Sequence, residues 1–334
     1  MGETGTEQRK IERCSCQKEL RRACDLCASA QYAFLACSIE CLREHQLGKH
    51  GSSVPAEAEQ RMRQAQREMN RRAPDAWDWY APHRRRVMDE LPRHSGTLCV
   101  FGAGNCADID LEYLAKRFSE VHLVDLDGEA IERSRDRQSQ AVRDRIVLHP
   151  NLDLSGFLDR LDAGPENFPQ GAELGQSVLL AARGLIQSLG RTFDVTLSTC
   201  VLSQLALSYQ EAWVVSEATS SSVVAATTAL HLATLVGSTR SGGAGFMAFD
   251  VLSSDDLPAL SDFRERPATE LQAFVESAIN QHEIALNPDP ASLRAQLSSS
   301  GLGSLLASSR LTLPWLWNIK SAQQLVYGLG FERC

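Results

Sequence analysis

Residues 99–108 read CVFGAGNCAD, and residues 121–127, farther along the chain, read VHLVDLD. The first stretch predicts a buried strand that ends in a tight turn, because glycine lacks a Cβ and accepts positive φ. Residues 108–118 then carry apolar side chains at 111, 114, 115 and 118, the spacing of one packed helical face. The second stretch predicts another buried strand, with carboxylates at its tip. This order indicates an α/β protein with a nucleoside site at the turn, where Asp125 can accept hydrogen bonds from ribose hydroxyls.

The length of the chain limits the number of domains, and its charge distribution limits the kinds of partner it can bind. The chain has 334 residues, enough for one large domain or two smaller ones. Residues 1–95 carry 17 Lys and Arg against 14 Asp and Glu, whereas residues 96–334 carry 17 against 28, a net charge of −11. This acidic main part disfavours a broad nucleic-acid-binding face.

Targeting signals are the next feature of the sequence. The N-terminus lacks the apolar core of a signal peptide. The longest weakly polar run, residues 223–237, is too short and too rich in Thr and His to span a bilayer. We therefore expect a cytoplasmic protein without a membrane partner, whose cysteines are reduced and available as metal ligands.

Six of the ten cysteines precede residue 42, and two histidines follow them. Their order is Cys14-x-Cys16, Cys24-x2-Cys27, Cys37-x3-Cys41 and His45-x4-His50. Eight ligands of this type suit two closed tetrahedral zinc sites, and a module this small would need the metal in order to fold. A single zinc ion with spare thiols is the alternative.

The block around residues 37–45, CSIECLREH, resembles the helix of the MYND and HIT zinc fingers. It departs from them in its first pair, which is Cys-x-Cys instead of Cys-x-x-Cys. The resemblance implies alternating ligands, with one zinc on Cys14, Cys16, Cys37 and Cys41 and the other on Cys24, Cys27, His45 and His50. It also implies a small treble-clef-like module over residues 1–55, of a type that usually binds proteins or peptides.

The glycine turn itself fits two cofactor families. The pattern Gly102-x-Gly104-x-x-Ala107, with Asp125 eighteen residues beyond Ala107, matches the dinucleotide fingerprint of NAD(P)-dependent enzymes. The same turn resembles motif I of class I S-adenosylmethionine-dependent methyltransferases, with Cys106 in place of the usual third glycine.

Four further segments resemble the methyltransferase order and favour that family. They are residues 145–154 for the third strand and its acidic tip, 192–205 for the fourth strand and motif IV, 242–250 for the fifth strand, and 311–319 with 324–333 for a closing antiparallel hairpin. The resemblance covers about residues 75–334. It implies a Rossmann-like α/β fold over residues 96–334, with a seven-stranded, mostly parallel sheet and an antiparallel C-terminal hairpin.

The resemblance also implies which residues would bind the cofactor. They lie at successive strand ends: Gly102, Ala103, Gly104, Asp108, Asp125, Leu126, Asp153, Leu154 and Thr199. Asp125 would hold the ribose, with Asp127 as its rival, and Asp108 could reach the methionine amino group. The alternative is helix capping for Asp108 and Asp127 and a turn role for Asp153.

Residues 56–95 are expected to form a linker and N-terminal helices. Residues 61–93 hold nine arginines and five acidic residues, which fits a solvated helix face or a docking strip for an acidic peptide or RNA. The aromatic residues at 77, 79 and 80, with His83, either cap the cofactor pocket or pack this segment onto the domain. In the first case their rings would suit a sulfonium cation.

Methyl transfer needs an aligned acceptor and exclusion of water more than covalent help from the protein. Where a base is needed, the candidates are Tyr80, His83, His231 and Asp250, each with a packing role as the alternative. We expect S-adenosylmethionine and zinc as cofactors and a peptide or protein acceptor docked by the finger. A small-molecule acceptor, an NAD(P) enzyme and a non-catalytic zinc-finger adaptor are the alternatives, and nucleic acid is not expected as a partner. The insert at residues 255–310 is expected to be mostly helical.

Overall fold

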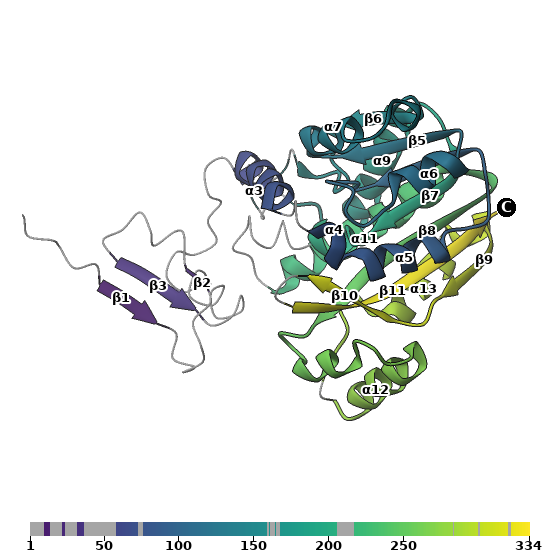
Figure 1. Ribbon diagram of the computed structural model, residues 1–334. Helices are drawn as coiled ribbons and strands as arrows, with labels where there is room; N and C mark the ends of the chain where they lie inside the picture. Colours follow the sequence, from purple (N-terminus) through teal and green to yellow (C-terminus); the bar gives the residue numbers. More distant parts are fainter. Residues whose placement is uncertain are drawn as a thin grey trace, which may run out of the picture.

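A computed structural model describes residues 10–13, 22–23, 32–36, 58–72, 76–158, 160, 164, 168–205, 217–282, 284–299, 301–319 and 322–334. Near the N-terminus three short strands pair in the order β1-β3-β2: β1 (Lys10–Arg13), β2 (Arg22–Ala23) and β3 (Tyr32–Ala36) (Figure 1). The eight predicted zinc ligands lie outside the described residues.

The main body is built on one eight-stranded sheet (Figure 1). Five strands run parallel: β4 (Thr97–Phe101), β5 (Glu120–Asp125), β6 (Ile146–Pro150), β7 (Phe193–Thr199) and β8 (Thr239–Ser253). The order across the sheet is β10-β11-β8-β7-β4-β5-β6, so the chain changes direction across the sheet beside β4. Such a switch point opens a crevice at the carboxyl ends of the strands, where open α/β sheets bind ligands.

The sheet closes with the predicted antiparallel hairpin. β11 (Ala322–Arg333) runs antiparallel to β8 on one side and to β9 (Leu306–Leu311) and β10 (Trp315–Ile319) on the other. The mostly parallel sheet with an antiparallel end is thus confirmed, but it has eight strands instead of seven. The expected strand 311–319 is divided at residues 312–314, because Pro314 cannot donate a hydrogen bond and Thr312 uses its Oγ1 to accept one from Gly328 N at 2.9 Å.

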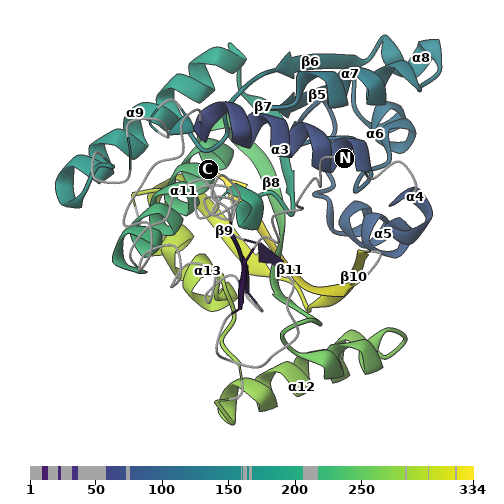
Figure 2. The same ribbon diagram turned by 90° about the vertical axis from the view of Figure 1, so that its left-hand side faces the viewer.

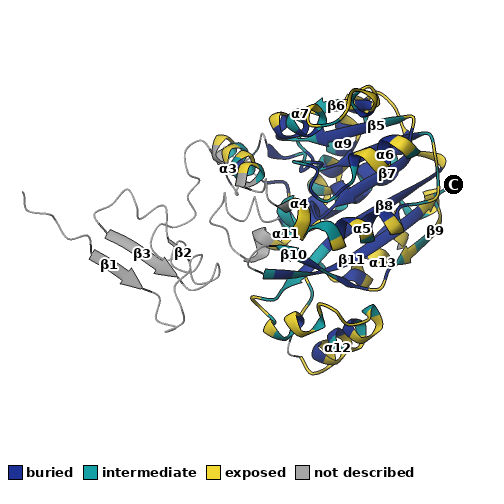
Figure 3. Ribbon diagram, in the orientation of Figure 1, coloured by how far each residue is buried: buried dark blue, intermediate teal, exposed yellow. Residues whose placement is uncertain are grey.

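Helices cover both faces of the sheet, which is buried between them (Figure 3). One face carries α5 (Ala81–Glu90), α6 (Leu111–Arg117), α7 (Gly128–Asp136) and α8 (Gln140–Arg143). The other carries α9 (Gly171–Leu189), α11 (Glu217–Ser238), α12 (Ala268–Asn280) and α13 (Pro290–Ser299). Strand β4 alternates accordingly: Leu98 and Val100 face the first group, and Cys99 and Phe101 face the second.

The helix after the glycine turn begins three residues later than predicted, at Leu111. Asp110 is its N-cap, because it has an extended backbone and its carboxylate accepts a hydrogen bond from Tyr113 N at 2.9 Å. The predicted apolar face is confirmed: the side chains at 111, 114, 115 and 118 are buried. The late start leaves Asp108 in the turn, outside the helix.

The connector contains two helices before α5, namely α3 (Ala58–Arg72) and α4 (Ala76–Trp79). α3 lies at the carboxyl ends of the parallel strands, in front of the sheet in Figure 2. Its Met62 is buried in a cluster with Phe157 and Phe168, and its Asn70 donates a hydrogen bond to Asp127 Oδ2 at 3.0 Å. The polar helix predicted here therefore has a packed face as well as a solvated one.

Two long segments complete the described fold. The insert between β8 and β9 is mostly helical, as predicted: η3 (Pro258–Phe263), α12, α13 and η4 (Gly303–Leu305). Within the described residues, one helix is long and apolar enough to cross a membrane, over Ser221–Ser238 of α11. Of that window, 61% is buried inside the protein, as in the core helix of a globular domain.

Candidate functional site

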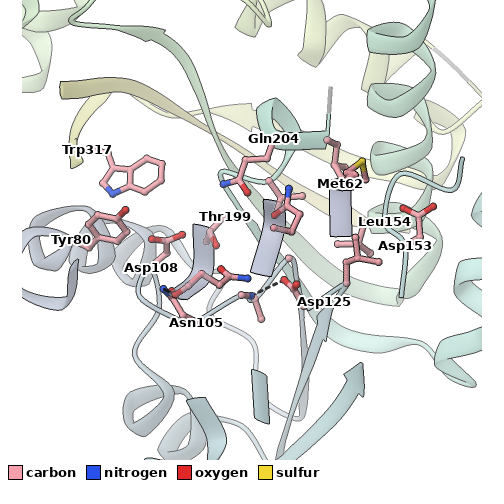
Figure 4. A pocket seen from close by; sticks show the side chains of 18 residues that line it. Met62, Tyr80, Asn105, Asp108, Asp125, Asp153, Leu154, Thr199, Gln204 and Trp317 are labelled. Atoms are coloured by element: carbon pink, nitrogen blue, oxygen red, sulfur yellow. Dashed lines mark hydrogen bonds between the residues drawn. The ribbon is translucent and has the colours of Figure 1, made fainter. Parts of the chain in front are cut away.

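A cavity opens at the carboxyl ends of β4, β5 and β7, beneath α3 (Figure 4). It encloses about 890 Å³, its open mouth included. All the residues predicted to bind the cofactor line this one cavity: Gly102, Ala103, Gly104, Asp108, Asp125, Leu126, Asp153, Leu154 and Thr199. The fold thus brings together residues that are up to 97 positions apart, while their role in binding stays a prediction.

The glycine turn forms the floor of the cavity. Gly102 and Gly104 have φ of 69° and 47°, and the backbone N–H groups of Gly102 and Ala103 both donate to Val124 O, at 2.9 and 3.1 Å. Cys106, in the position of the expected third glycine, also has a positive φ, 56°. The turn therefore keeps the left-handed backbone even where the glycine is absent, at a cost of about 1–2 kcal/mol.

The turn yields a stability prediction with a matched pair of variants. A Cβ on Gly102 would lie 1.8 Å from Val201 Cγ2, whereas a Cβ on Gly190, whose φ is nearly the same at 70°, would have nothing within 4 Å. We expect Gly190→Ala to lower the free energy of unfolding by about 1 kcal/mol, from backbone strain alone. We expect Gly102→Ala to lower it by at least about 2 kcal/mol more, because of the added overlap. Denaturant titration measures both, and equal losses would contradict the contact with Val201.

Asp125 ends β5 and faces the cavity from the side of the turn. Its Oδ2 accepts a hydrogen bond from Gly104 N at 2.7 Å (Figure 4). Its Oδ1 accepts one from Asp127 N, also at 2.7 Å. A carboxylate has about four acceptor positions, so each oxygen can accept one further bond from a ligand hydroxyl. Burial raises the pKa of Asp125 to about 6.

The rival carboxylate, Asp127, has a structural role. It caps α7 by accepting a hydrogen bond from Ala130 N at 3.2 Å, and it holds Asn70 of α3. It is 2% exposed and is absent from the lining of the cavity. The helix-capping alternative is therefore correct for Asp127. It is wrong for Asp108, because Asp110 is the N-cap of the helix that follows, α6.

Asp108 is the least satisfied polar group of the cavity wall. Its Oδ1 is buried and has no hydrogen-bond partner among the described residues. Burial raises the pKa of Asp108 to about 7; nearby Arg84 lowers it and Asp250 raises it. Arg84 itself donates to the carbonyl oxygens of Ala107, at 2.8 Å, and Trp77, at 3.0 Å. A half-buried carboxylate with one buried, unpartnered oxygen fits a cationic ligand group in this cavity.

Two aromatic rings stand beside Asp108, namely Tyr80 and Trp317 (Figure 4). Their centroids are 5.0 Å apart in an edge-to-face arrangement. Burial raises the pKa of Tyr80 to about 12, so its hydroxyl stays protonated at neutral pH. The neighbouring Trp77 and Trp79 do not line this cavity and are 47% and 42% exposed, so only Tyr80 of the predicted aromatic cap lies at the site.

Asp153 and Leu154 line the opposite end of the cavity, next to Met62 (Figure 4). The Asp153 carboxylate accepts hydrogen bonds from Ser155 N and Leu158 N, both at 2.8 Å, and also from Ser155 Oγ. These bonds give Asp153 the turn role that the sequence left open. If Asp153 also contacts the nucleobase of a ligand, it would do so while keeping these hydrogen bonds.

Neither of the two histidines considered as bases lines the cavity, although the His83 ring stacks on Trp317, which does, with ring centroids 4.8 Å apart. His83 Nδ1 accepts a hydrogen bond from Trp315 Nε1 at 3.0 Å, so the neutral ring carries its proton on Nε2. Burial lowers the pKa of His83 to about 3 and that of His231, which bonds Ser198 Oγ at 2.8 Å, to about 4. Both rings are therefore neutral and packed, and burial keeps the nearby Cys200 thiol protonated by raising its pKa.

Sequence reasoning missed the residues that α3 and the C-terminal hairpin contribute. They are Met62, Gln66 and Asn70 of α3 and Trp317 of β10, together with Asn105, Val201, Gln204 and Leu205 near the predicted motifs. Met62, Ala65 and Met69 recur at the i, i+3 and i+7 spacing of one helix face, and this was the signal that could have pointed to a packed face.

The described part of the chain contains no group of three or more His, Cys, Asp or Glu side chains placed to hold a metal ion. The predicted zinc ligands fall outside that part, so the zinc sites stay a prediction from the sequence.

The known proteins that this chain resembles are found among solved structures. No family model matches this sequence, and no curated protein matches it. Among solved structures, the chain is similar to the N-methyltransferase NodS from Bradyrhizobium japonicum WM9, with 12% identity, 76% of this chain and 93% of that chain covered, and a TM-score of 0.34. It is also similar to an rRNA methylase from Streptococcus thermophilus, with 14% identity, coverage of 75% and 93%, and a TM-score of 0.31. A third is the methyltransferase domain of bacterial CtHen1, with 12% identity, coverage of 76% and 96%, and a TM-score of 0.35. At these identities and scores the likeness assigns neither a family nor a substrate.

Proposed function

We propose that this chain is an S-adenosylmethionine-dependent methyltransferase. The observation that carries the proposal is the half-buried Asp108 carboxylate, whose Oδ1 is buried without a hydrogen-bond partner among the described residues, on the wall of a cavity that also holds Asp125 and two aromatic rings. S-adenosylmethionine carries an ammonium and a sulfonium charge, which suit a buried carboxylate and aromatic faces.

The same electrostatics disfavour the dinucleotide alternative. A pyrophosphate would be bound at the start of the helix after the turn, but here Asp108 and Asp110 stand between the glycines and α6. The helix N-terminus is already capped by the Asp110 carboxylate. Two carboxylates would repel a pyrophosphate, whereas a cation would be attracted.

Each wall of the cavity then has an assigned role. Asp125 would accept hydrogen bonds from the ribose hydroxyls, and the backbone of the glycine turn would lie beneath the methionine part. Leu126 and Leu154 would contact the adenine, and Asp108 would pair with the ammonium group. Tyr80 and Trp317 would face the sulfonium.

When bound, S-adenosylmethionine supplies an activated methyl group. The protein's contribution is to hold the acceptor in line and to exclude water, and α3 does the latter by covering the cavity with Met62. Tyr80 stays protonated at neutral pH, so it can donate a hydrogen bond but cannot remove a proton. Neither His83 nor His231 lines the cavity, and burial lowers their pKa values to about 3 and about 4, so we expect an acceptor atom whose lone pair is available without a histidine base.

Calorimetry with the full chain tests the proposal. We expect S-adenosylmethionine and S-adenosylhomocysteine to bind and NAD not to bind. Incubation with tritiated S-adenosylmethionine and a cell lysate should then label an acceptor, which we propose to be a peptide or protein. Binding without any transfer would favour the non-catalytic adaptor, and binding of NAD alone would overturn the cofactor assignment.

The cysteine–histidine block is proposed as a zinc-dependent docking module of the same protein, in the cytoplasm. Elemental analysis of the purified chain should give about two zinc ions, since eight ligands make two four-coordinate sites. Cys24→Ser should lower this number by about one, whereas Cys334→Ser, at an exposed thiol far along the chain, should leave it unchanged. A chain without bound zinc, or equal effects of the two variants, would contradict the module.

A further inference from the structure

A second cavity lies behind the glycine turn, between α3, Trp77 of α4 and α7. It encloses about 610 Å³, its open mouth included. Three arginines reach it: Arg71 from α3, Arg133 from α7, and Arg137, the C-cap of α7, four residues after Arg133 and on the same side. The first cavity lies on the other side of Asn105, which lines both.

The three guanidinium groups outnumber their carboxylate partners. Glu129 Oε2 lies 3.1 Å from Arg71 Nη2 and 3.5 Å from Arg133 Nη1, so the two arginines share one carboxylate. Arg137 has no ion pair within the residues that the structure describes. The cavity therefore has a local excess of positive charge, although residues 96–334 have a net charge of −11.

Two further groups of the wall are suited to a ligand. The Ser134 hydroxyl is buried, with the residue 3% exposed, and it makes no geometric hydrogen bond to a described residue, although the Cys106 thiol lies nearby as a weak partner. Trp77 is 47% exposed, and the Arg84 guanidinium stacks on its ring at 3.4 Å from the centroid, which leaves the opposite face of the ring open.

We propose that this cavity binds a small phosphate ester. The arginines would take the phosphate oxygens, because a planar guanidinium matches a phosphate with two parallel hydrogen bonds. The Ser134 hydroxyl would donate a further hydrogen bond, and the open face of Trp77 would contact the esterified group. A small ester is favoured over a nucleic acid, because the acidic main body repels a polyanion.

The test uses the full chain and ligands that do not resemble the nucleoside proposed for the first cavity. Calorimetry is run with inorganic phosphate, phenyl phosphate and phenol. We expect both phosphates to bind, phenyl phosphate more tightly, and phenol not to bind. This outcome does not depend on methyl transfer, so it can fail or succeed separately from the proposed function.

Two arginine variants distinguish binding in this cavity from a general effect of positive charge on phosphate affinity. Arg137→Gln should weaken phenyl phosphate binding by at least about tenfold, the loss expected for a charge-assisted hydrogen bond. Arg135→Gln removes the same charge from the same helix, but Arg135 pairs with Asp136 and does not line the cavity. It should leave the affinity nearly unchanged.

Three results would overturn the proposal. The first is no binding of either phosphate at millimolar concentration, and the second is an equal loss in Arg135→Gln and Arg137→Gln. The third is tighter binding of a phosphoserine peptide than of phenyl phosphate, which would assign the surface to a protein partner.

Discussion

Replacement of Asp125 by alanine is expected to weaken binding of S-adenosylmethionine by at least about 100-fold. The carboxylate would accept both ribose hydroxyls, and two hydrogen bonds to a charged acceptor contribute together about 3 kcal/mol or more. The same change removes the acceptor for Gly104 N and Asp127 N, so the glycine turn also loses its anchor. Calorimetry with the purified variant measures the affinity.

Two further variants make the Asp125 result interpretable. Asp125→Asn has the same shape, but its amide nitrogen cannot accept a hydrogen bond from one of the two backbone N–H groups that the carboxylate holds. It should therefore lie between the wild type and alanine in both affinity and thermal unfolding temperature. Asp136→Ala removes a carboxylate that is exposed at the end of α7 and should bind normally. Undiminished affinity in Asp125→Ala would sink the assignment of this cavity to a nucleoside.

The second large effect is expected at Asp108, where stability and affinity should change in opposite directions. Asp108→Asn removes a charge that is half-buried in the free protein, with an unpartnered Oδ1, so at pH 8 it should raise the free energy of unfolding by about 2–4 kcal/mol. The variant also loses the partner of the cationic ligand, so the affinity for S-adenosylmethionine should fall by about 10- to 100-fold. Thermal unfolding and calorimetry on the same preparation test the pair of effects.

The pH dependence of the Asp108 effect follows from its raised pKa. In the folded protein the pKa is about 7 instead of the ordinary 3.8, so the folded state holds the proton more tightly than the unfolded state. The wild type is therefore penalised above about pH 7, and the penalty disappears as the pH falls below about 4. The stabilisation of Asp108→Asn should vanish over the same window.

Asp110→Asn is the matched control for Asp108→Asn, because it removes the same charge two residues away. Asparagine serves as an N-cap almost as well as aspartate, so this variant should change neither stability nor affinity by much. If Asp108→Asn were no more stable than Asp110→Asn at pH 8, the burial of an uncompensated charge at Asp108 would be contradicted.

Much of the candidate site could be predicted from the sequence, because its residues follow buried strands. Gly102, Asp125, Asp153 and Thr199 each stand at or just beyond a strand end that periodicity or motif resemblance indicates. The carboxyl ends of parallel strands meet at one edge of a sheet, so strand recognition alone places these residues near each other. This is why the predicted cofactor set lines a single cavity.

The parts that could not be predicted depend on contacts between distant segments. Asp108, Asp110 and Asp127 are all aspartates between a strand and the next helix. Asp110 and Asp127 nevertheless cap helices, whereas Asp108 lies on the cavity wall. The sequence allowed His83 to be a base beside the site. In the structure its Nδ1 accepts a hydrogen bond from the indole N–H of Trp315, which is 232 residues away in the chain. The spacing of Met62, Ala65 and Met69 marks an apolar stripe on α3, but the sequence does not say what this narrow stripe packs against, because the cavity is formed by strands far along the chain.

Local patterns in the sequence by themselves determined the strand–turn–helix–strand unit and the apolar face of α6, since each depends on neighbouring residues and short-range backbone preferences. The antiparallel hairpin was predicted from resemblance to a known family. Tertiary structure alone decided which carboxylate is left with an unpaired oxygen, which aromatic rings stand beside it and which helix covers it. The physical reason is that charge burial and desolvation are set by everything packed around a group, and the sequence neighbours are only a small part of that surrounding.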